Sequence, residues 1–186
     1  GIGATDKEIN LANYLKHDIF IDLDLGSDTI QGTIGNDALF LQNFATTGNA
    51  LYQEETETIS SSPRILGVEN FHLSDGDNFL DFTSTNTSLS GLDFVTTFGS
   101  GNDIFWSSDA NEIISLGNGN DQLILNGGTD NVTTGLGNDI ITITNSVGTS
   151  HLLDFNTEED VFIFYTSADN LTIEQDKVIV QNIRRL

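Results

Sequence analysis

The sequence predicts an all-β fold: a right-handed parallel β-roll, or β-helix solenoid, with irregular N-terminal coils and a C-terminal β cap. Three observations predict it. Acidic residues recur every nine positions, a large apolar residue follows each acid by two positions, and glycines precede every second acid. Each nine-residue unit is typical of a turn followed by a short strand. Two units make one coil, and stacked coils form two parallel sheets, which right-handed crossovers should connect.

The N-terminal elements are the least regular. Residues 1–25 are predicted mainly as strands, with one short helix after Thr5 as the alternative. Two partial repeats follow, GSDTI at 26–30 and GTIGNDALF at 32–40, and they place Asp28 and Asp37 nine positions apart. A weaker copy, GDNFL at 76–80, carries Asn78 in place of the acid. Residues 1–97 are therefore expected to form irregular β coils that are continuous with the stack.

The repeat is most regular between residues 98 and 142, within a predicted β-roll at 98–151. We call the first, third and fifth acids the odd ladder and the other two the even ladder. The odd ladder contains Asp103, Asp121 and Asp139, and the even ladder contains Glu112 and Asp130. The even ladder is expected to stop at Gly148, eighteen residues after Asp130. The residues predicted to point into the core are Phe105, Ile114, Leu123, Val132 and Ile141.

Residues 152–186 are predicted to close the stack, because solenoids need a cap at an open end. The segment VFIF at 161–164 is expected to be a strand. The segment LTIEQDKVIVQNI at 171–183 alternates in polarity and predicts a hairpin with its turn at residues 175–177.

The charge of the chain restricts its partners. Six Lys and Arg residues stand against 28 Asp and Glu, a formal net charge of −22. Such a chain repels nucleic acid and anionic membranes, and cations are its natural partners. No apolar run has the length of a membrane span, so membrane insertion is not expected. Cysteine is absent, which excludes thiolate metal sites.

Geometry favours calcium as the cation. Neighbouring strands lie about 4.8 Å apart, and an ion between two stacked carboxylates meets both at the ~2.3 to 2.6 Å that Ca²⁺ prefers. Turn carbonyls should complete each site, so two gaps in the odd ladder and one in the even ladder predict three ions. Asp28 and Asp37 are further candidates, with Asp-stabilised turns as the alternative. The other candidate ligands are the ladder acids together with Gly99, Gly101, Gly117, Gly119, Gly135, Gly137, Asn102, Asn120 and Asn138.

The odd repeats GSGNDIF, GNGNDQL and GLGNDII resemble the repeats-in-toxin (RTX), or hemolysin-type, calcium-binding nonapeptide G-G-x-G-x-D-x-U-x. The even repeats depart from this pattern, because Glu112 replaces Asp and glycines are missing. The resemblance implies a Ca²⁺-binding β-roll module of a secreted or cell-surface bacterial protein. It also implies folding on calcium and a structural, adhesive or assembly role.

Catalytic patterns are scarce. His17, His72 and His151 lie far apart with no HExxH motif. The rival hypothesis is a module of a β-helical polysaccharide-processing enzyme or another secreted hydrolase, in which two carboxylates act as acid and base. An anionic sugar needs cationic residues, and the six Lys and Arg do not cluster in the repeats. A non-catalytic module is therefore predicted.

The outer faces of the two sheets should differ, because side chains alternate along a strand. The odd strands would expose Ile104, Trp106, Gln122, Ile124, Ile140 and Thr142, whereas the even strands would expose Ile113, Ser115, Asn131 and Thr133. An exposed apolar face predicts a cover. Two covers are considered: the C-terminal strands folding back, or a neighbouring chain in a homo-oligomer or array.

Overall fold

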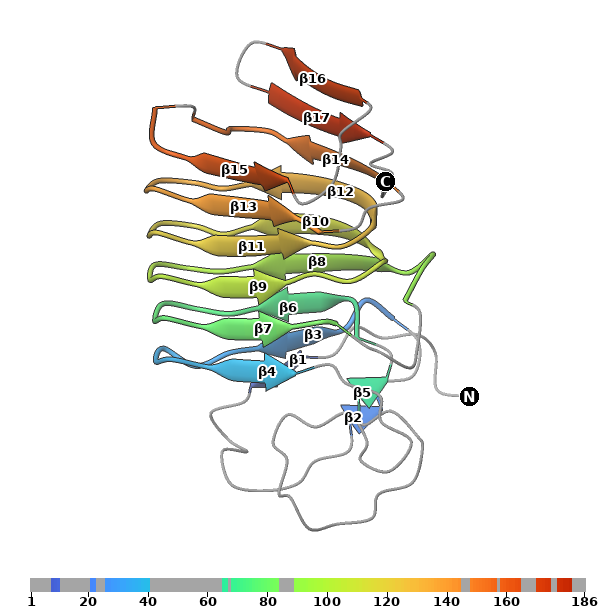
Figure 1. Ribbon diagram of the computed structural model, residues 1–186. Coiled ribbons are helices and arrows are strands. Elements are labelled where there is room, and N and C mark those ends of the chain that lie inside the picture. Colours follow the sequence, from blue (N-terminus) through green and yellow to red (C-terminus); the bar gives the residue numbers. More distant parts are fainter. Residues whose placement is uncertain are drawn as a thin grey trace.

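The computed structural model is a stack of β coils (Figure 1). It describes residues 8–10, 21–22, 26–40, 65–66, 68–83, 89–144, 148–156, 158–164, 170–174 and 177–181. In these ranges every regular element is a strand. None is therefore a helix with the length and apolarity of a membrane span. The short helix considered within residues 1–25 falls mostly outside the described ranges, which there include two short strands, β1 (Glu8–Asn10) and β2 (Ile21–Asp22).

Two sheets run along the stack. The first contains, in spatial order, β1, β3 (Thr29–Gln31), β6 (Asn70–His72), β8 (Asp93–Thr97), β10 (Asn111–Ser115), β12 (Gly128–Thr133), β14 (Gly148–Leu152), β17 (Lys177–Gln181) and β16 (Asn170–Glu174). The second contains β15 (Val161–Phe164), β13 (Ile140–Ile143), β11 (Gln122–Leu125), β9 (Ile104–Trp106), β7 (Phe79–Asp81) and β4 (Ala38–Phe40). A small third sheet pairs β2 with β5 (Ile65–Leu66).

The register confirms the eighteen-residue coil. Ile114 lies opposite Val132 in the first sheet, and Leu123 lies opposite both Phe105 and Ile141 in the second. Strands from β1 to β14 and from β4 to β15 pair in parallel. A parallel β-roll is therefore the fold of the described residues, as predicted.

The core lies between the two sheets. All five residues predicted to point inward are buried, each no more than 1% exposed. Aromatic rings fill the interior of the coils from β6 to β9: Phe82 contacts Phe71 at a ring-centroid distance of 4.7 Å and Phe105 at 5.1 Å. These T-shaped contacts bury large rings without any contribution from charge.

The C-terminal strands close only the first sheet. Strands β16 and β17 form the predicted hairpin, and β17 pairs antiparallel with β14. Strand β15, the segment VFIF, adds the next parallel strand to the second sheet. The prediction that these strands fold back over the outer face of the second sheet is therefore wrong: β15 extends that sheet, and β17 belongs to the other one (Figure 1).

The turns that lead from the first sheet to the second are tightly stacked. A Cβ atom at Gly119 would lie 1.6 Å from the carbonyl oxygen of Gly101, and one at Gly137 would lie 1.7 Å from that of Gly119. Gly119 also has a positive φ of 144°. Only glycine permits both this conformation and this close approach of two backbones.

Replacing Gly119 by Ala should therefore destabilise the fold by about 3 kcal/mol or more. Gly91→Ala is the matched control, since Gly91 has a φ of 84° but no atom within 4 Å of the added Cβ. It should carry only the conformational cost of about 1 kcal/mol. Urea unfolding with calcium in excess measures both losses, and equal losses would contradict the crowding argument.

Candidate metal centre

The odd ladder is longer in the structure than in the sequence pattern. Register pairs place Asp103, Asp121 and Asp139 on successive coils directly before the strands of the second sheet. The same column begins at Asp37 and Asn78 and ends at Asp160. The three predicted aspartates are buried, at no more than 1% exposure. Six side chains therefore share one column along the side of the stack.

Each side chain of the odd ladder bonds to the preceding coil. The backbone N–H of Asp103 donates to Asp121 Oδ1 at 2.8 Å, and that of Asp121 donates to Asp139 Oδ1 at 2.9 Å. Asp103 Oδ1 accepts the N–H of Asn78 at 2.8 Å, and Asp160 Oδ1 accepts that of Asp139 at 3.1 Å. One carboxylate oxygen per coil is thus satisfied by backbone.

The second oxygen of each predicted aspartate is different. Oδ2 of Asp103, Asp121 and Asp139 is buried and accepts no hydrogen bond from any described residue. A buried acceptor without a partner costs about 1 to 3 kcal/mol, and more when it is charged. Three such oxygens on consecutive coils therefore indicate a binding site for a positively charged partner.

Asn78 shows what that partner must contact. Its Oδ1 accepts the N–H of Asp37 at 2.9 Å, as the aspartates do on other coils. Its Nδ2 stands where they have Oδ2, and it donates to the carbonyls of Ser74 at 3.0 Å and Gly76 at 2.9 Å. Two turn carbonyls therefore converge on this position from four and two residues before the ladder residue.

The same turn positions before the three aspartates are glycines. They are Gly99 and Gly101, Gly117 and Gly119, and Gly135 and Gly137. A carboxylate oxygen beside two carbonyl oxygens is a set of acceptors, which suits an oxygen-loving cation such as Ca²⁺. In the described residues no three His, Cys, Asp or Glu side chains gather in one cluster. Backbone carbonyls must therefore supply part of any metal site on this ladder.

The electrostatics of the odd ladder also favour a bound cation. The pKa of Asp121 is raised to about 7: burial is the main cause, a backbone hydrogen bond from Asp103 lowers it, and the neighbouring carboxylates of Asp139 and Asp103 raise it. Burial also raises the pKa of Asp139 to about 6, and it raises the pKa of Asp103. Ionised carboxylates are thus disfavoured here until a positive charge compensates them.

The predicted asparagines form a separate, exposed column. The N–H of Asn120 donates to Asn102 Oδ1 at 2.9 Å, and that of Asn138 donates to Asn120 Oδ1 at 2.9 Å. These bonds run from a coil to the side chain of the preceding coil, opposite in direction to those of the odd ladder. The side-chain oxygens of Asn102 and Asn120 are therefore engaged between coils, and their role as metal ligands stays a prediction.

The even ladder differs from the prediction. Asp130 lies opposite Ser150, whereas Gly148 lies opposite Gly128, because this coil is longer than eighteen residues. The expectation that Gly148 ends the ladder is therefore wrong. Among the described residues its column contains Asp28, Glu69, Phe94, Glu112, Asp130 and Ser150.

Hydrogen bonds satisfy much of the even ladder. Asp130 Oδ1 accepts the N–H of Glu112 at 3.2 Å, and its Oδ2 accepts the hydroxyl of Ser150 at 3.2 Å. Glu112 Oε1 accepts the N–H and hydroxyl of Ser108, whereas its Oε2 is buried and has no donor among the described residues. Burial raises the pKa of Glu112 to about 7 and that of Asp130 to about 8.

Asp28 and Asp37 belong to different ladders. Asp37 heads the odd column, and its carboxylate accepts the N–H and hydroxyl of Thr33. Asp28 is the first described residue of the even column, and its N–H donates to Glu69 Oε2 at 2.9 Å. The sequence pattern missed Glu69, Asp160 and Ser150 as ladder members. Asp160 carried a signal, because Phe162 follows it by two positions as in the repeats.

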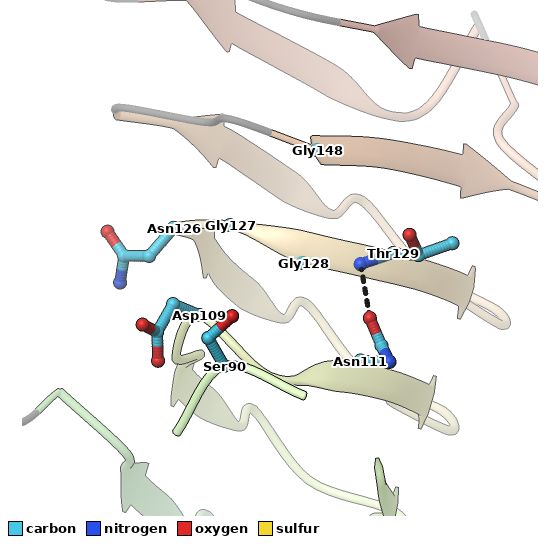
Figure 2. Close-up of a pocket in the computed structure, with 8 residues that line it drawn as sticks. All are labelled: Ser90, Asp109, Asn111, Asn126, Gly127, Gly128, Thr129 and Gly148. Carbon is cyan, nitrogen blue, oxygen red and sulfur yellow. Dashed lines mark hydrogen bonds between the residues drawn. The ribbon is translucent and has the colours of Figure 1, made fainter. Parts of the chain in front are cut away.

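A polar pocket lies on the corner of the stack that carries the turn between β11 and β12 (Figure 2). Its volume is about 440 Å³, and it is lined by Ser90, Asp109, Asn111, Asn126, Gly127, Gly128, Thr129 and Gly148. The N–H of Thr129 donates to Asn111 Oδ1 across it at 3.0 Å. Asp109 is its one acid, and its Oδ1 accepts the N–H of Leu89. No ladder carboxylate lines this pocket.

Comparison with known proteins agrees with the ladder geometry. The family model of the RTX calcium-binding nonapeptide repeat (4 copies) matches residues 22–42, 99–123 and 106–141. The search of curated proteins and the search of solved structures give no match. The family match includes the turns of Asp28 and Asp37 as well as the three coils with buried aspartates. These parts of the chain are RTX calcium-binding nonapeptide repeats, and such repeats bind Ca²⁺.

Proposed function

We propose that the protein is a module that folds around calcium ions and serves a structural, adhesive or assembly role in a secreted or cell-surface bacterial protein. The observation that carries the proposal is the row of buried, unpaired Oδ2 atoms of Asp103, Asp121 and Asp139. They lie in turns that match a calcium-binding repeat. Proteins with this repeat are typically secreted by bacteria, which supports the extracellular assignment.

The proposed ions occupy the gaps between successive aspartates of the odd ladder. Asp121 would serve two gaps, one shared with Asp103 and one with Asp139. The carbonyls of the turn glycines Gly99, Gly101, Gly117, Gly119, Gly135 and Gly137 would complete the oxygen shells. When bound, the ion supplies positive charge, and the chain's own residues supply the register that brings its ligands together.

The gap between Glu112 and Asp130 is a third proposed site. Fewer observations support this site than support the odd ladder. Glu112 Oε2 is its one unpaired buried oxygen, because both oxygens of Asp130 accept hydrogen bonds. Asp28 and Asp37 complete the proposed set of acids. Thr33 already donates twice to Asp37, which reduces what an ion would add there.

A non-catalytic role is also part of the proposal. The unpaired carboxylate oxygens are buried, where a polymeric sugar does not reach them, and the repeats contain no cluster of Lys or Arg. The alternative, a module of a polysaccharide-processing enzyme or another secreted hydrolase, would place the catalytic residues outside the ladders. This module would then support the catalytic part of such a protein.

The outer face of the second sheet is the proposed contact surface for a second copy of the chain. Ile104, Trp106, Ile124 and Ile140 point outward as predicted, and Trp106 and Ile140 are each 37% exposed. Strand β15 lengthens the face with Val161, which is 50% exposed. The outward residues of β9, β11, β13 and β15 carry no charge, so in a chain of net charge −22 two copies can approach on this part of the face with the least repulsion.

Removal of calcium should lower the melting temperature by many degrees, because the buried carboxylates lose their counterion. Three ions at ten times their dissociation constants contribute about 4 kcal/mol by mass action. Thermal unfolding followed by circular dichroism, with calcium and with excess chelator, measures the change. Magnesium at equal concentration is the control, and an unchanged melt in chelator would refute the proposal.

Asp121→Ala should remove about two bound ions and Asp103→Ala about one, because Asp121 serves two gaps between acids and Asp103 serves one. Isothermal titration calorimetry counts the ions in each variant. Asp93→Ala is the matched control, since Asp93 is exposed and lies outside both ladders and outside the turns that carry the proposed ligands. Equal losses at Asp121 and Asp103 would contradict the shared-gap arrangement.

The calcium-free protein should become less stable as pH rises. Its folded state binds protons more tightly than the unfolded chain, because burial raises the pKa of Asp139, Asp121 and Asp130 to about 6, 7 and 8. Their contribution is therefore fully present below the unfolded pKa of about 3.9 and lost as pH rises through 6 to 8. Urea midpoints in metal-free buffer at pH 5 and pH 8 measure this loss.

The calcium-saturated protein is the control for this pH dependence. Protons compete with calcium for the same oxygens, so its stability should rise from pH 5 to pH 8. A calcium-free form that also gains stability with pH would show that the ladder carboxylates ionise without cost.

A further inference from the structure

The odd ladder contains two kinds of turn. In the turns that end at Asp103, Asp121 and Asp139, the second carboxylate oxygen is buried and unpaired. In the turn that ends at Asp37, Thr33 donates to both carboxylate oxygens. In the turn that ends at Asn78, the side-chain amide donates to two carbonyls of the turn. The boundary between the two kinds lies between β7 and β9.

The Asn78 turn is satisfied without an ion. Asn78 is buried, at 2% exposure, and its amide nitrogen donates to the carbonyls of Ser74 and Gly76. Its amide oxygen accepts the N–H of Asp37, so the orientation of the amide is determined on both sides. The amide N–H group thus provides positive character at the position that the unpaired Oδ2 takes in the turns of Asp103, Asp121 and Asp139.

The Asp37 turn is satisfied by a hydroxyl. Thr33 Oγ1 donates to Asp37 Oδ1 at 2.9 Å, and its N–H donates to Asp37 Oδ2 at 2.7 Å. The residue at this position, four before the ladder residue, is glycine in the turns of Asp103, Asp121 and Asp139. Glycine has no hydroxyl to donate, so those turns lack this internal partner.

We infer that Asn78 is a built-in substitute for a calcium ion, which makes the coil at residues 68–83 independent of metal. This coil would then be a folded platform on which the calcium-dependent coils at 99–141 stack. The inference rests on the proposed function, because it assigns metal dependence to some coils and not to others. The predicted start of the β-roll at residue 98 falls at the same boundary.

The core supports a metal-independent platform. Phe71 and Phe82 of this coil contact each other, and both contact Phe94, at ring-centroid distances of 5.9 and 5.5 Å. Burial of such rings depends on apolar area and not on a bound cation. The turn is satisfied and the interior is filled, so nothing in the described part of this coil requires an ion.

Hydrogen exchange of the wild-type chain tests the inference directly. Mass spectrometry of peptides from residues 68–83 and 99–141 would be compared in calcium and in chelator. Removal of calcium should accelerate exchange in 99–141 by at least about tenfold and leave 68–83 nearly unchanged. Equal acceleration in both segments would overturn the inference.

Two reciprocal substitutions test the role of the amide. Asn78→Asp removes the donor and adds an acceptor, so it should bind about one more ion and make residues 68–83 calcium-dependent in exchange. Asp103→Asn supplies an amide to the carbonyls of Gly99 and Gly101. It should lose about one ion, and chelation should lower its melting temperature less than that of the wild type.

The outcomes separate this inference from the proposed function. A wild-type chain that binds no calcium in titration calorimetry would overturn both. Calcium binding with unchanged stoichiometry in Asn78→Asp and an undiminished effect of chelation in Asp103→Asn would overturn the inference alone. If either variant fails to fold in calcium, the exchange pattern of the wild-type chain decides the question.

Discussion

Stacking coils one strand spacing apart places equivalent side chains in columns, and every column must be tolerable at a separation of about 4.8 Å. Apolar side chains pack favourably at this separation, as Phe105, Leu123 and Ile141 do in the core. A column of buried carboxylates does not, because like charges repel and each oxygen needs a donor. The turns, the ladders and the proposed calcium dependence of this fold all follow from how the repulsion and the unpaired oxygens of the acidic column are compensated.

Two hydrogen-bonded columns, one of aspartates and one of asparagines, connect neighbouring coils, and their hydrogen bonds run in opposite directions. Asp121 accepts from the coil before it, whereas Asn120 donates its backbone N–H to the side chain of that same coil. Adjacent residues thus connect each turn to its neighbour twice. This leaves one carboxylate oxygen per coil for another partner, and the amide of Asn78 shows that a protein group can occupy that place.

The nine-residue period predicted the fold, the inward residues and the aspartates of the three regular coils, because these depend only on strand alternation and stacking. It did not assign Asp160 or Ser150 to the ladders, since the offsets between coils there are 21 and 20 residues. Strand β15 was predicted as a strand but assigned to the wrong place, because the alternation in VFIF is the same whether it extends a sheet or covers one. The pairing partner, and not the local pattern, decides between them.

The two corners of the stack differ in how much sequence they accept. The turn from the first sheet to the second spans six residues at 98–103, 116–121 and 134–139, and eight residues at 153–160 in the last coil. On the opposite corner the chain between β4 and β6 runs from residue 41 to residue 69, apart from β5, and that between β7 and β8 runs from 82 to 92. The ladder nevertheless continues from Asp37 to Asn78 and from Asn78 to Asp103 without a break. The edge with the acidic ladder therefore keeps one turn length through the regular coils, while the opposite edge accepts inserted segments of different lengths. New loops can be gained on that opposite edge without altering the spacing of the ladder.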